Sequence, residues 1–348
     1  MAEISGRRVD RRQLLRVTAV AGVSVALGGG LVRAVMQRAR LRQVRETRSL
    51  MGTLVVITVV HPDRDAARQI IANTFDEMER LEDLLSRHRE GTPIWSLNLS
   101  GVVDSPPPEV VEVIQRALEY STMTAGAFDI TVTPLIDVYE SSYSERGVPP
   151  SDQDLSRALA LVGSGNVTVE SGRITLDKPG MGITLDGIAK GYIVDRAVGV
   201  LAEQGAERVL VDAGGDMSSA GESLLGGGWR IAIQDPRARD RRLGVVELRG
   251  ESIATSGDYM QYFTDDMSTH HIVDPRTGAS PEHTSSVTIV TSSAMKADAL
   301  ATAVLVLGPE EGLSLIERLE DVEGMIVTKE QDIIVSRGLD RFLSTNSE

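Results

Sequence analysis

Apolar residues recur along this chain at two spacings, one typical of helices and one typical of strands. Residues 65–88 carry apolar side chains at helical spacing, among them Ile70, Phe75 and Leu81. A second helical pattern over residues 109–124 follows the break at Pro106-Pro107-Pro108. Further helices are predicted over residues 152–162, 187–204, 294–307 and 310–320.

Between these helices lie short segments with the composition of strands. They are predicted over residues 53–60, 127–135, 207–212, 229–234, 244–248, 253–255 and 259–264, with hairpins over 166–177 and 325–335. Residues 139–151 are polar and predict an exposed loop. Several strands follow one another without an intervening helix, so we expect antiparallel pairing and an α+β fold. Neither a phosphate-binding loop nor a dinucleotide glycine motif is present, which leaves a Rossmann domain without support.

The first 48 residues differ in charge from the rest of the 348-residue chain. They hold eleven Arg against three acidic residues, a balance of +8, so the remainder carries −14 − 8 = −22. An acidic body argues against nucleic-acid binding, which needs a basic face. The pair Arg11-Arg12 precedes sixteen uncharged residues, 17–32, as in a twin-arginine export signal. An uncleaved membrane anchor and a basic arm on a cytoplasmic protein are the alternatives. The chain has no cysteine, which excludes disulfides, thiolate metal sites and a lipidated cysteine anchor.

A carboxylate and a hydroxyl stand four residues apart in the predicted helix at 294–307. Asp298 and Thr302 therefore share one helix face, about one turn apart. Oxygen ligands of this kind suit magnesium, which takes few ligands from protein and the rest from water and phosphate. From the spacing alone, a hydrogen-bonded polar residue at a helix start and a packed threonine are the favoured explanation.

Two of the five histidines are adjacent, at positions 270 and 271, just before the turn sequence Asp274-Pro275-Arg276-Thr277-Gly278. Neighbours in a strand point to opposite faces, so one of them at most can face a given site.

Seven short motifs, in this order, resemble the FAD:protein FMN transferase family, also called the ApbE flavin transferases. The resemblance runs from Met51 to about Gly308. The motifs are Met51-Gly52-Thr53, Gly126 to Thr131, Asp186 to Tyr192, Ala213 to Asp216, Thr255 to Tyr259, His271 to Gly278 and Ala297 to Thr302.

The resemblance implies two closely packed sub-domains, within residues 49–348, that hold FAD between them. It implies magnesium bound by the Gly187 carbonyl, Asp298 and Thr302, and catalysis by His271 as base together with Asp298. The residues that it implies for binding the flavin nucleotide are Met51, His88, Ala127, Phe128, Asp129, Thr184, Lys190, Gly215, Asp216, Thr255, Ser256, Gly257 and Asp258.

Two positions depart from the family pattern. His88 stands where the family has Tyr, and a solvated histidine at a helix end explains it equally well. Thr184 stands where the family has an Asp, and Asp186 follows two residues later. Lys190, at the start of a predicted helix, is the candidate cation for phosphate, and a solvated surface lysine is the alternative.

The resemblance implies magnesium-dependent transfer of FMN from FAD to a Ser or Thr hydroxyl of an exported or membrane flavoprotein, with release of AMP. The alternatives are an FAD pyrophosphatase and an exported FAD-binding protein without catalysis. Residues 183–195 resemble the NosX branch, linked to nitrous oxide reduction, so we expect an acceptor in that or another membrane electron-transfer chain. With the export signal, this predicts a periplasmic protein or one attached to the outer face of the inner membrane.

Overall fold

A large antiparallel sheet forms the base of the molecule. The computed structural model describes residues 41–238 and 240–344. Eight strands pair in the order β1-β2-β6-β7-β10-β11-β12-β13. They are β1 (Arg42–Leu50), β2 (Thr53–His61), β6 (Val209–Ala213), β7 (Asp216–Ala220), β10 (Ser252–Gly257), β11 (Thr284–Thr291), β12 (Glu323–Thr328) and β13 (Ile333–Val335).

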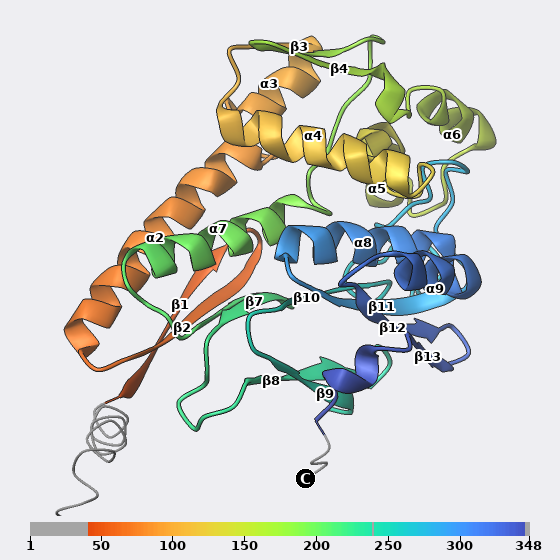
Figure 1. Ribbon diagram of the computed structural model, residues 1–348. Helices are drawn as coiled ribbons and strands as arrows, with labels where there is room; N and C mark the ends of the chain where they lie inside the picture. The colour runs from red at the N-terminus through yellow and green to blue at the C-terminus, as the bar shows by residue number, and fades with distance from the viewer. Residues whose placement is uncertain (1–40, 239, 345–348) are drawn as a thin grey trace, which may run out of the picture.

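Helices cover one face of this sheet and a hairpin covers part of the other, as Figure 1 shows. The helices are α2 (Arg64–Leu85), α7 (Ala189–Glu203), α8 (Ala294–Leu307) and α9 (Pro309–Arg318), and the hairpin is β8 (Trp229–Gln234) with β9 (Arg242–Leu248). Strand β11 is buried at all eight positions. Val287 and Ile289 pack with α8, whereas Val290 packs with the hairpin. A strand covered on both faces needs no polar side, which explains its apolar and small residues.

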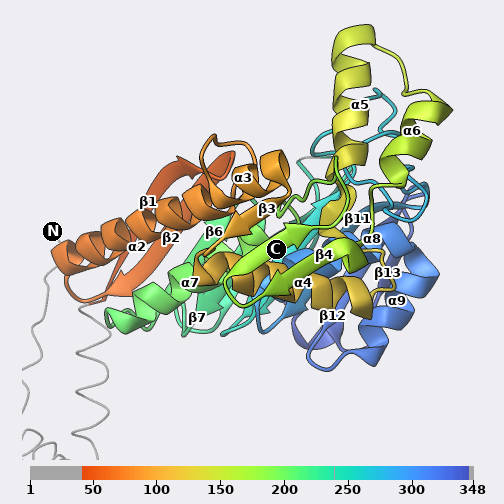
Figure 2. The ribbon, with the colours of Figure 1, turned by 90° about the horizontal axis from the view of Figure 1, so that it is seen from above.

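A second sub-domain lies over α7 and α8 (Figure 1). It contains α3 (Pro93–Ser100), β3 (Val102–Asp104), α4 (Pro108–Met123), α5 (Thr133–Arg146), α6 (Asp152–Leu159), β4 (Val167–Glu170) and β5 (Arg173–Leu176). The short 3-10 turns are η1 (Ile130–Val132) and η2 (Ser164–Asn166) here and η3 (Leu339–Arg341) near the C-terminus. Helices α5 and α6 project together at one end of the molecule (Figure 2).

The α+β class is confirmed, as are the helices at α2, α4, α7, α8 and α9 and the β4–β5 hairpin. The strand predicted over residues 127–135 and the loop predicted over 139–151 are wrong. Residues 130–132 form a 3-10 turn, and α5 runs on to Arg146. Pro134 lies in the first turn of α5, where its missing N–H costs nothing, so it begins a helix instead of ending a strand.

Two further corrections concern the chain near its N-terminus and the segment after β10. Strand β1 begins at Arg42, so residues 42–48, which the sequence assigns to the N-terminal segment, belong to the sheet. The strand predicted over 259–264 is wrong, since that segment has a single bridge between Tyr262 and His270. The predicted export segment lies, up to residue 40, outside the described residues. No helix in the described part of the chain combines the length and apolar character needed to span a bilayer.

Candidate active site

Helices α7 and α8 meet so closely that only glycine fits at position 191. A Cβ built on Gly191 would lie 2.3 Å from the Ala294 carbonyl oxygen. At this contact the Gly191 N–H donates to Asp298 Oδ2 at 3.1 Å. The first turn of α7 thus holds the carboxylate that the sequence proposes as a metal ligand.

Asp195 ties the same two helices together from the other side. Its carboxylate accepts from Ser293 Oγ at 2.7 Å, from the Ala294 N–H at 2.7 Å and from the Met295 N–H at 3.0 Å. Backbone N–H groups at a helix start have no partner within the helix, so a carboxylate from α7 satisfies those of α8. Asp195 therefore sets where α8 begins and, through it, where Asp298 and Thr302 lie.

Thr302 lies one turn beyond Asp298 and faces a glycine and a serine. Its Oγ1 is 3.1 Å from Ser256 Oγ at the end of β10. A Cβ on Gly187 would lie 3.3 Å from Thr302 Oγ1 and 3.3 Å from Phe128 Cε2. The backbone at 187 therefore approaches Thr302 at a point where a larger residue would fill the space.

Two buried carboxylates and one lysine complete this group. Asp298 is 5% exposed and Asp216 is 2% exposed, and Lys190 Nζ lies 3.2 Å from Asp216 Oδ2. Burial raises the pKa of Asp298 well above its usual range, and the Asp216 charge raises it further. Burial likewise raises the pKa of Asp216, against the opposing effect of Lys190. We call Gly187, Lys190, Asp216, Ser256, Asp298 and Thr302 the α7–α8 cluster.

The α7–α8 cluster fits a hard cation that shares its coordination with phosphate. In the described part of the chain no three carboxylate or imidazole groups converge into a metal site. The available donors are instead the Asp298 carboxylate, the Thr302 hydroxyl and the carbonyl of Gly187, all oxygen, as magnesium prefers. A divalent cation would also favour the ionised form of the two buried carboxylates.

His271 lies in the segment that returns from β10, residues 258–271, which we call the His271 loop. Its Nδ1 lies 2.9 Å from the Gln261 carbonyl oxygen. Burial lowers its pKa, with the charges of Asp186 and Lys190 acting in opposite directions. His270 is fully buried, and burial lowers its pKa to about 4. Of the two histidines, His271 is the one that is not fully buried and that is influenced by the charges of Asp186 and Lys190, so it stays the candidate base.

Most of the other predicted flavin-binding residues surround these groups. Met51 lies in the turn between β1 and β2 and has a positive φ of 52°. This turn lies beside the turn that precedes Asp216, because a Cβ built on Gly214 would be 2.3 Å from Thr53 Oγ1. Gly215 has open space around its Cα. Thr184 accepts from the Asp186 N–H through Oγ1 at 3.2 Å, and Asp186 lies 3.7 Å from His88 Nε2.

Four of the predicted flavin-binding positions make contacts within the protein. Both oxygens of Asp129 are hydrogen-bonded, to Thr131 and to the Ser164 N–H. Asp258 is fully buried between Arg237 at 2.6 Å and Lys329 at 2.5 Å. Two neighbours of Asp258 are also engaged: Thr255 Oγ1 lies 2.9 Å from Thr288 Oγ1, and Gly257 leaves room for the Tyr259 ring. Every carboxylate oxygen of Asp129 and Asp258 is therefore bonded within the protein.

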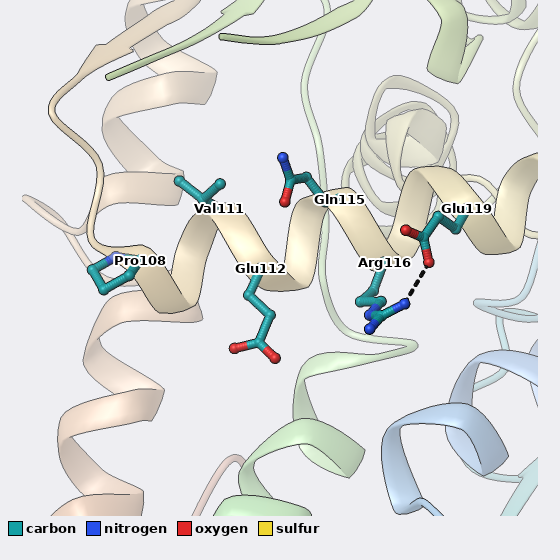
Figure 3. Close-up of a pocket in the computed structure, with 6 residues that line it drawn as sticks. All are labelled: Pro108, Val111, Glu112, Gln115, Arg116 and Glu119. Carbon is teal, nitrogen blue, oxygen red and sulfur yellow. Dashed lines mark hydrogen bonds and ion pairs between the residues drawn. The ribbon is translucent and has the colours of Figure 1, made fainter. Parts of the chain in front are cut away.

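Two surface hollows lie away from the α7–α8 cluster. One of about 460 Å³ runs along α4 and is lined by Pro108, Val111, Glu112, Gln115, Arg116 and Glu119 (Figure 3). The other, of about 370 Å³, lies between the end of α4 and α9. Neither hollow is lined by a predicted site residue. The buried carboxylates and the lysine of the α7–α8 cluster therefore mark the candidate site, and the hollows do not.

Sequence reasoning missed the residues that position the site. Asp195 follows Lys190 by five residues. Its role is to accept hydrogen bonds at the start of α8, which lies about a hundred residues later in the chain. Asn98 is not among the predicted site residues, yet its side chain bonds both the N–H and the carbonyl of Ile183, at 2.7 and 2.8 Å. A polar residue inside an apolar helix was the available signal in both cases.

Comparisons with known proteins identify the family of the chain. The model of the ApbE family matches residues 51–326. A FAD:protein FMN transferase of Klebsiella pneumoniae (strain 342) is 31% identical over 82% of this chain and 90% of its own length. The solved ApbE protein of Thermotoga maritima superposes with a TM-score of 0.80 at 30% identity, covering 87% of this chain and all of that one. The flavin transferase ApbE of Vibrio cholerae gives 0.76 at 29% identity, again over 87% of this chain and all of that one.

These similarities identify the enzyme class and the family of the chain. The fold is that of solved flavin transferases, and with its curated relatives it makes the chain a flavinyltransferase. The chain belongs to the ApbE family.

Proposed function

We propose that this protein transfers FMN from FAD to a Ser or Thr hydroxyl of a target flavoprotein and releases AMP, with magnesium as the metal. The observation that carries the proposal is that Gly187 and Ser256 both meet Thr302, one helical turn from Asp298, whose carboxylate is held by the Gly191 N–H. The names of the relatives, FAD:protein FMN transferase, support the same donor and a protein acceptor.

The chain's own groups account for most of the reaction. The acceptor oxygen attacks the FMN-side phosphorus, a phosphoester bond forms, and the bond from that phosphorus to the AMP oxygen breaks. Asp298, Thr302 and the Gly187 carbonyl would hold magnesium, which would neutralise charge at the pyrophosphate. Lys190 adds a second positive charge beside Asp216.

His271 receives the proton from the acceptor hydroxyl. A carbonyl oxygen only accepts, so the contact between Nδ1 and the Gln261 carbonyl makes Nδ1 the donor. The neutral ring then has its lone pair on Nε2, which is the atom able to take a proton. The lowered pKa of His271 keeps that ring neutral at pH 7.

The decisive experiment is an intact-mass measurement. The purified protein is incubated with FAD, magnesium chloride and a candidate acceptor, and acceptor mass, AMP and free FMN are followed. We expect the acceptor to gain one FMN moiety in step with AMP, and to lose that gain when its target Ser or Thr is replaced by Ala. Free FMN with an unmodified acceptor would instead make the protein a pyrophosphatase. Intact FAD throughout would contradict both reactions.

We further propose that the protein acts outside the cytoplasm, on an exported or membrane electron-transfer protein. Arg11-Arg12 and the uncharged run after them support export. Replacing both arginines with lysine should leave the protein in the cytoplasmic fraction of its host. Unchanged fractionation would contradict export by this route. Membership of the NosX branch stays a prediction.

A further inference from the structure

The imidazole of His271 is oriented by a backbone group. The Gln261 carbonyl accepts from both the His271 backbone N–H, at 3.0 Å, and Nδ1, at 2.9 Å. The orientation of the ring therefore depends on where residues 260–263 lie. A substitution of the Gln261 side chain, which is exposed, would leave this carbonyl in place.

The residues flanking Gln261 differ in how they are held. Met260 is 61% exposed and Tyr262 is 47% exposed, so neither anchors the segment by burial. Phe263 stacks on two tyrosines of α5. Its ring centroid lies 5.9 Å from that of Tyr139 at 16° and 5.2 Å from that of Tyr143 at 9°. Near-parallel rings at these distances contribute beyond the area they bury.

The α5 platform is itself fixed. Tyr139 is 6% exposed, and its hydroxyl donates to the Gly278 carbonyl at 2.9 Å. Val273, two residues after His271, packs in the same apolar cluster with Leu135 and Phe263. Helix α5 thus holds the chain on both sides of His271. The tip of the loop has a separate tie, from Lys329 Nζ to the Met267 carbonyl at 3.2 Å.

We infer that Phe263 is the positioning residue of the base: its stack on Tyr139 and Tyr143 holds the Gln261 carbonyl against His271 Nδ1 and so keeps Nε2 unprotonated. Without the stack, the Gln261 carbonyl can leave Nδ1. The ring can then adopt the other tautomer, in which Nε2 carries the proton and accepts none. The inference rests on the proposed function only for its effect on rate, because the tautomer is a property of the free protein.

The first test is nitrogen NMR of the histidine side chains in the full chain without substrate. With five histidines, His271→Gln identifies the signals of residue 271. We expect protonated Nδ1 in the wild type and in Phe263→Tyr, which keeps a ring for the stack. Phe263→Ala should shift residue 271 toward protonated Nε2. Tyr262→Ala, which removes a neighbouring exposed aromatic side chain outside the stack, is the matched control and should keep protonated Nδ1.

The second test is kinetic. Phe263→Ala should lower kcat roughly 10²-fold, as misplacement of a catalytic group does, while KM for FAD stays within twofold. Phe263→Tyr should restore the rate. Tyr143→Leu removes one partner of the stack from the α5 side. It should change the tautomer of His271 and the rate in the same direction as Phe263→Ala does. This variant tests the inference if Phe263→Ala fails to fold.

Different results would contradict the role of His271 as base and the role of Phe263 as its positioning residue. Wild-type transfer in His271→Ala would remove His271 as base and leave the tautomer result standing. A protonated Nδ1 in folded Phe263→Ala or Tyr143→Leu would overturn the inference, and so would a loss of rate without a change of tautomer.

Discussion

The two halves of the active site are positioned by different means. In the α7–α8 cluster one helix carries both Asp298 and Thr302, and their relative position follows from helix geometry. In the His271 loop no regular element carries the base. It is held by contacts from α5, from Gln261 and from Lys329, which lie far apart in the sequence. We therefore expect substitutions in the cluster to affect metal and nucleotide together, and substitutions at the loop to affect the base or the fold separately.

The largest effect should follow Asp298→Asn. The amide keeps the size of the side chain and can accept from Gly191 N–H, but it removes the charge that would hold magnesium. We expect kcat/KM to fall on the order of 10³-fold, typical of losing one strong electrostatic contact in a transition state. Titration of the rate against magnesium should show a weaker dependence. Asp152→Asn, at an exposed position in α6, serves as the control. Wild-type magnesium dependence in Asp298→Asn would remove this carboxylate from the metal site.

A large effect on stability, with less on chemistry, should follow Arg237→Met. Asp258 is fully buried, and the variant leaves it with Lys329 as its charged partner. The buried carboxylate loses one of its two cationic partners and is only partly compensated by Lys329, so the free energy of unfolding should fall by about 3 kcal/mol at pH 7. Urea unfolding measures it, with the exposed Arg249→Met as a control. A fall equal to that of the control would show that the buried pair does not stabilise this loop.

The pH dependence of this loss has a definite sign. Burial alone raises the pKa of Asp258, but the hydrogen bonds from Arg237 and Lys329 outweigh it and hold that pKa below its usual range. A carboxylate with a depressed folded pKa stabilises above its unfolded pKa of about 3.9, and this is lost as pH falls through the folded pKa. The difference between wild type and Arg237→Met should therefore be constant from pH 5 to 8 and shrink below about pH 4.

The same contrast explains what the sequence could predict. The helix at 294–307 and the pairing of Asp298 with Thr302 depend on residues four apart, so a local pattern was sufficient. Asp129 and Asp258 lie in motifs predicted to bind the flavin, and their carboxylates prove to be engaged with Ser164 and Arg237, 35 and 21 residues away. Local patterns hold no information on such partners.

Helix α5 shows the limit most clearly. Its residues 139–146 are polar enough to predict a loop, and its apolar contacts are few. The helix is stabilised by the packing of Leu135 and Tyr139 against Phe263 and Val273. Those two residues lie more than a hundred positions later in the chain. Tertiary packing overrides a weak local preference in such cases. This helix carries the two tyrosines that, in our inference, position His271 through Phe263.

A smaller effect should follow Asp195→Ala, which removes the acceptor for three donors at the start of α8. Loss of a helix cap costs about 1–2 kcal/mol in the free energy of unfolding. Because α8 carries Asp298, the apparent affinity for magnesium should also fall about tenfold, as for loss of an outer partner of a metal ligand. Asp63→Ala removes the cap of α2, away from the site, and should leave magnesium affinity unchanged. Equal magnesium affinity in both variants would confine Asp195 to a structural role.

The smallest effect should follow His88→Ala, at the rim between the two halves. The His88 side chain is 62% exposed, and its Nε2 lies 3.7 Å from Asp186 Oδ2. Exposed ion pairs contribute at most about 1 kcal/mol, so the affinity for FAD should change by less than about fivefold. The hydrogen bond to Asp186 raises the pKa of His88, so any contribution of its positive charge is complete at low pH and is lost as pH rises through that raised pKa. Titrating FAD at pH 6 and pH 9 by quenching of flavin fluorescence should show the difference only at pH 6. A change above tenfold at both values would mean that the imidazole contacts the flavin directly, which would make the rim a third positioning element beside the α7–α8 cluster and the His271 loop.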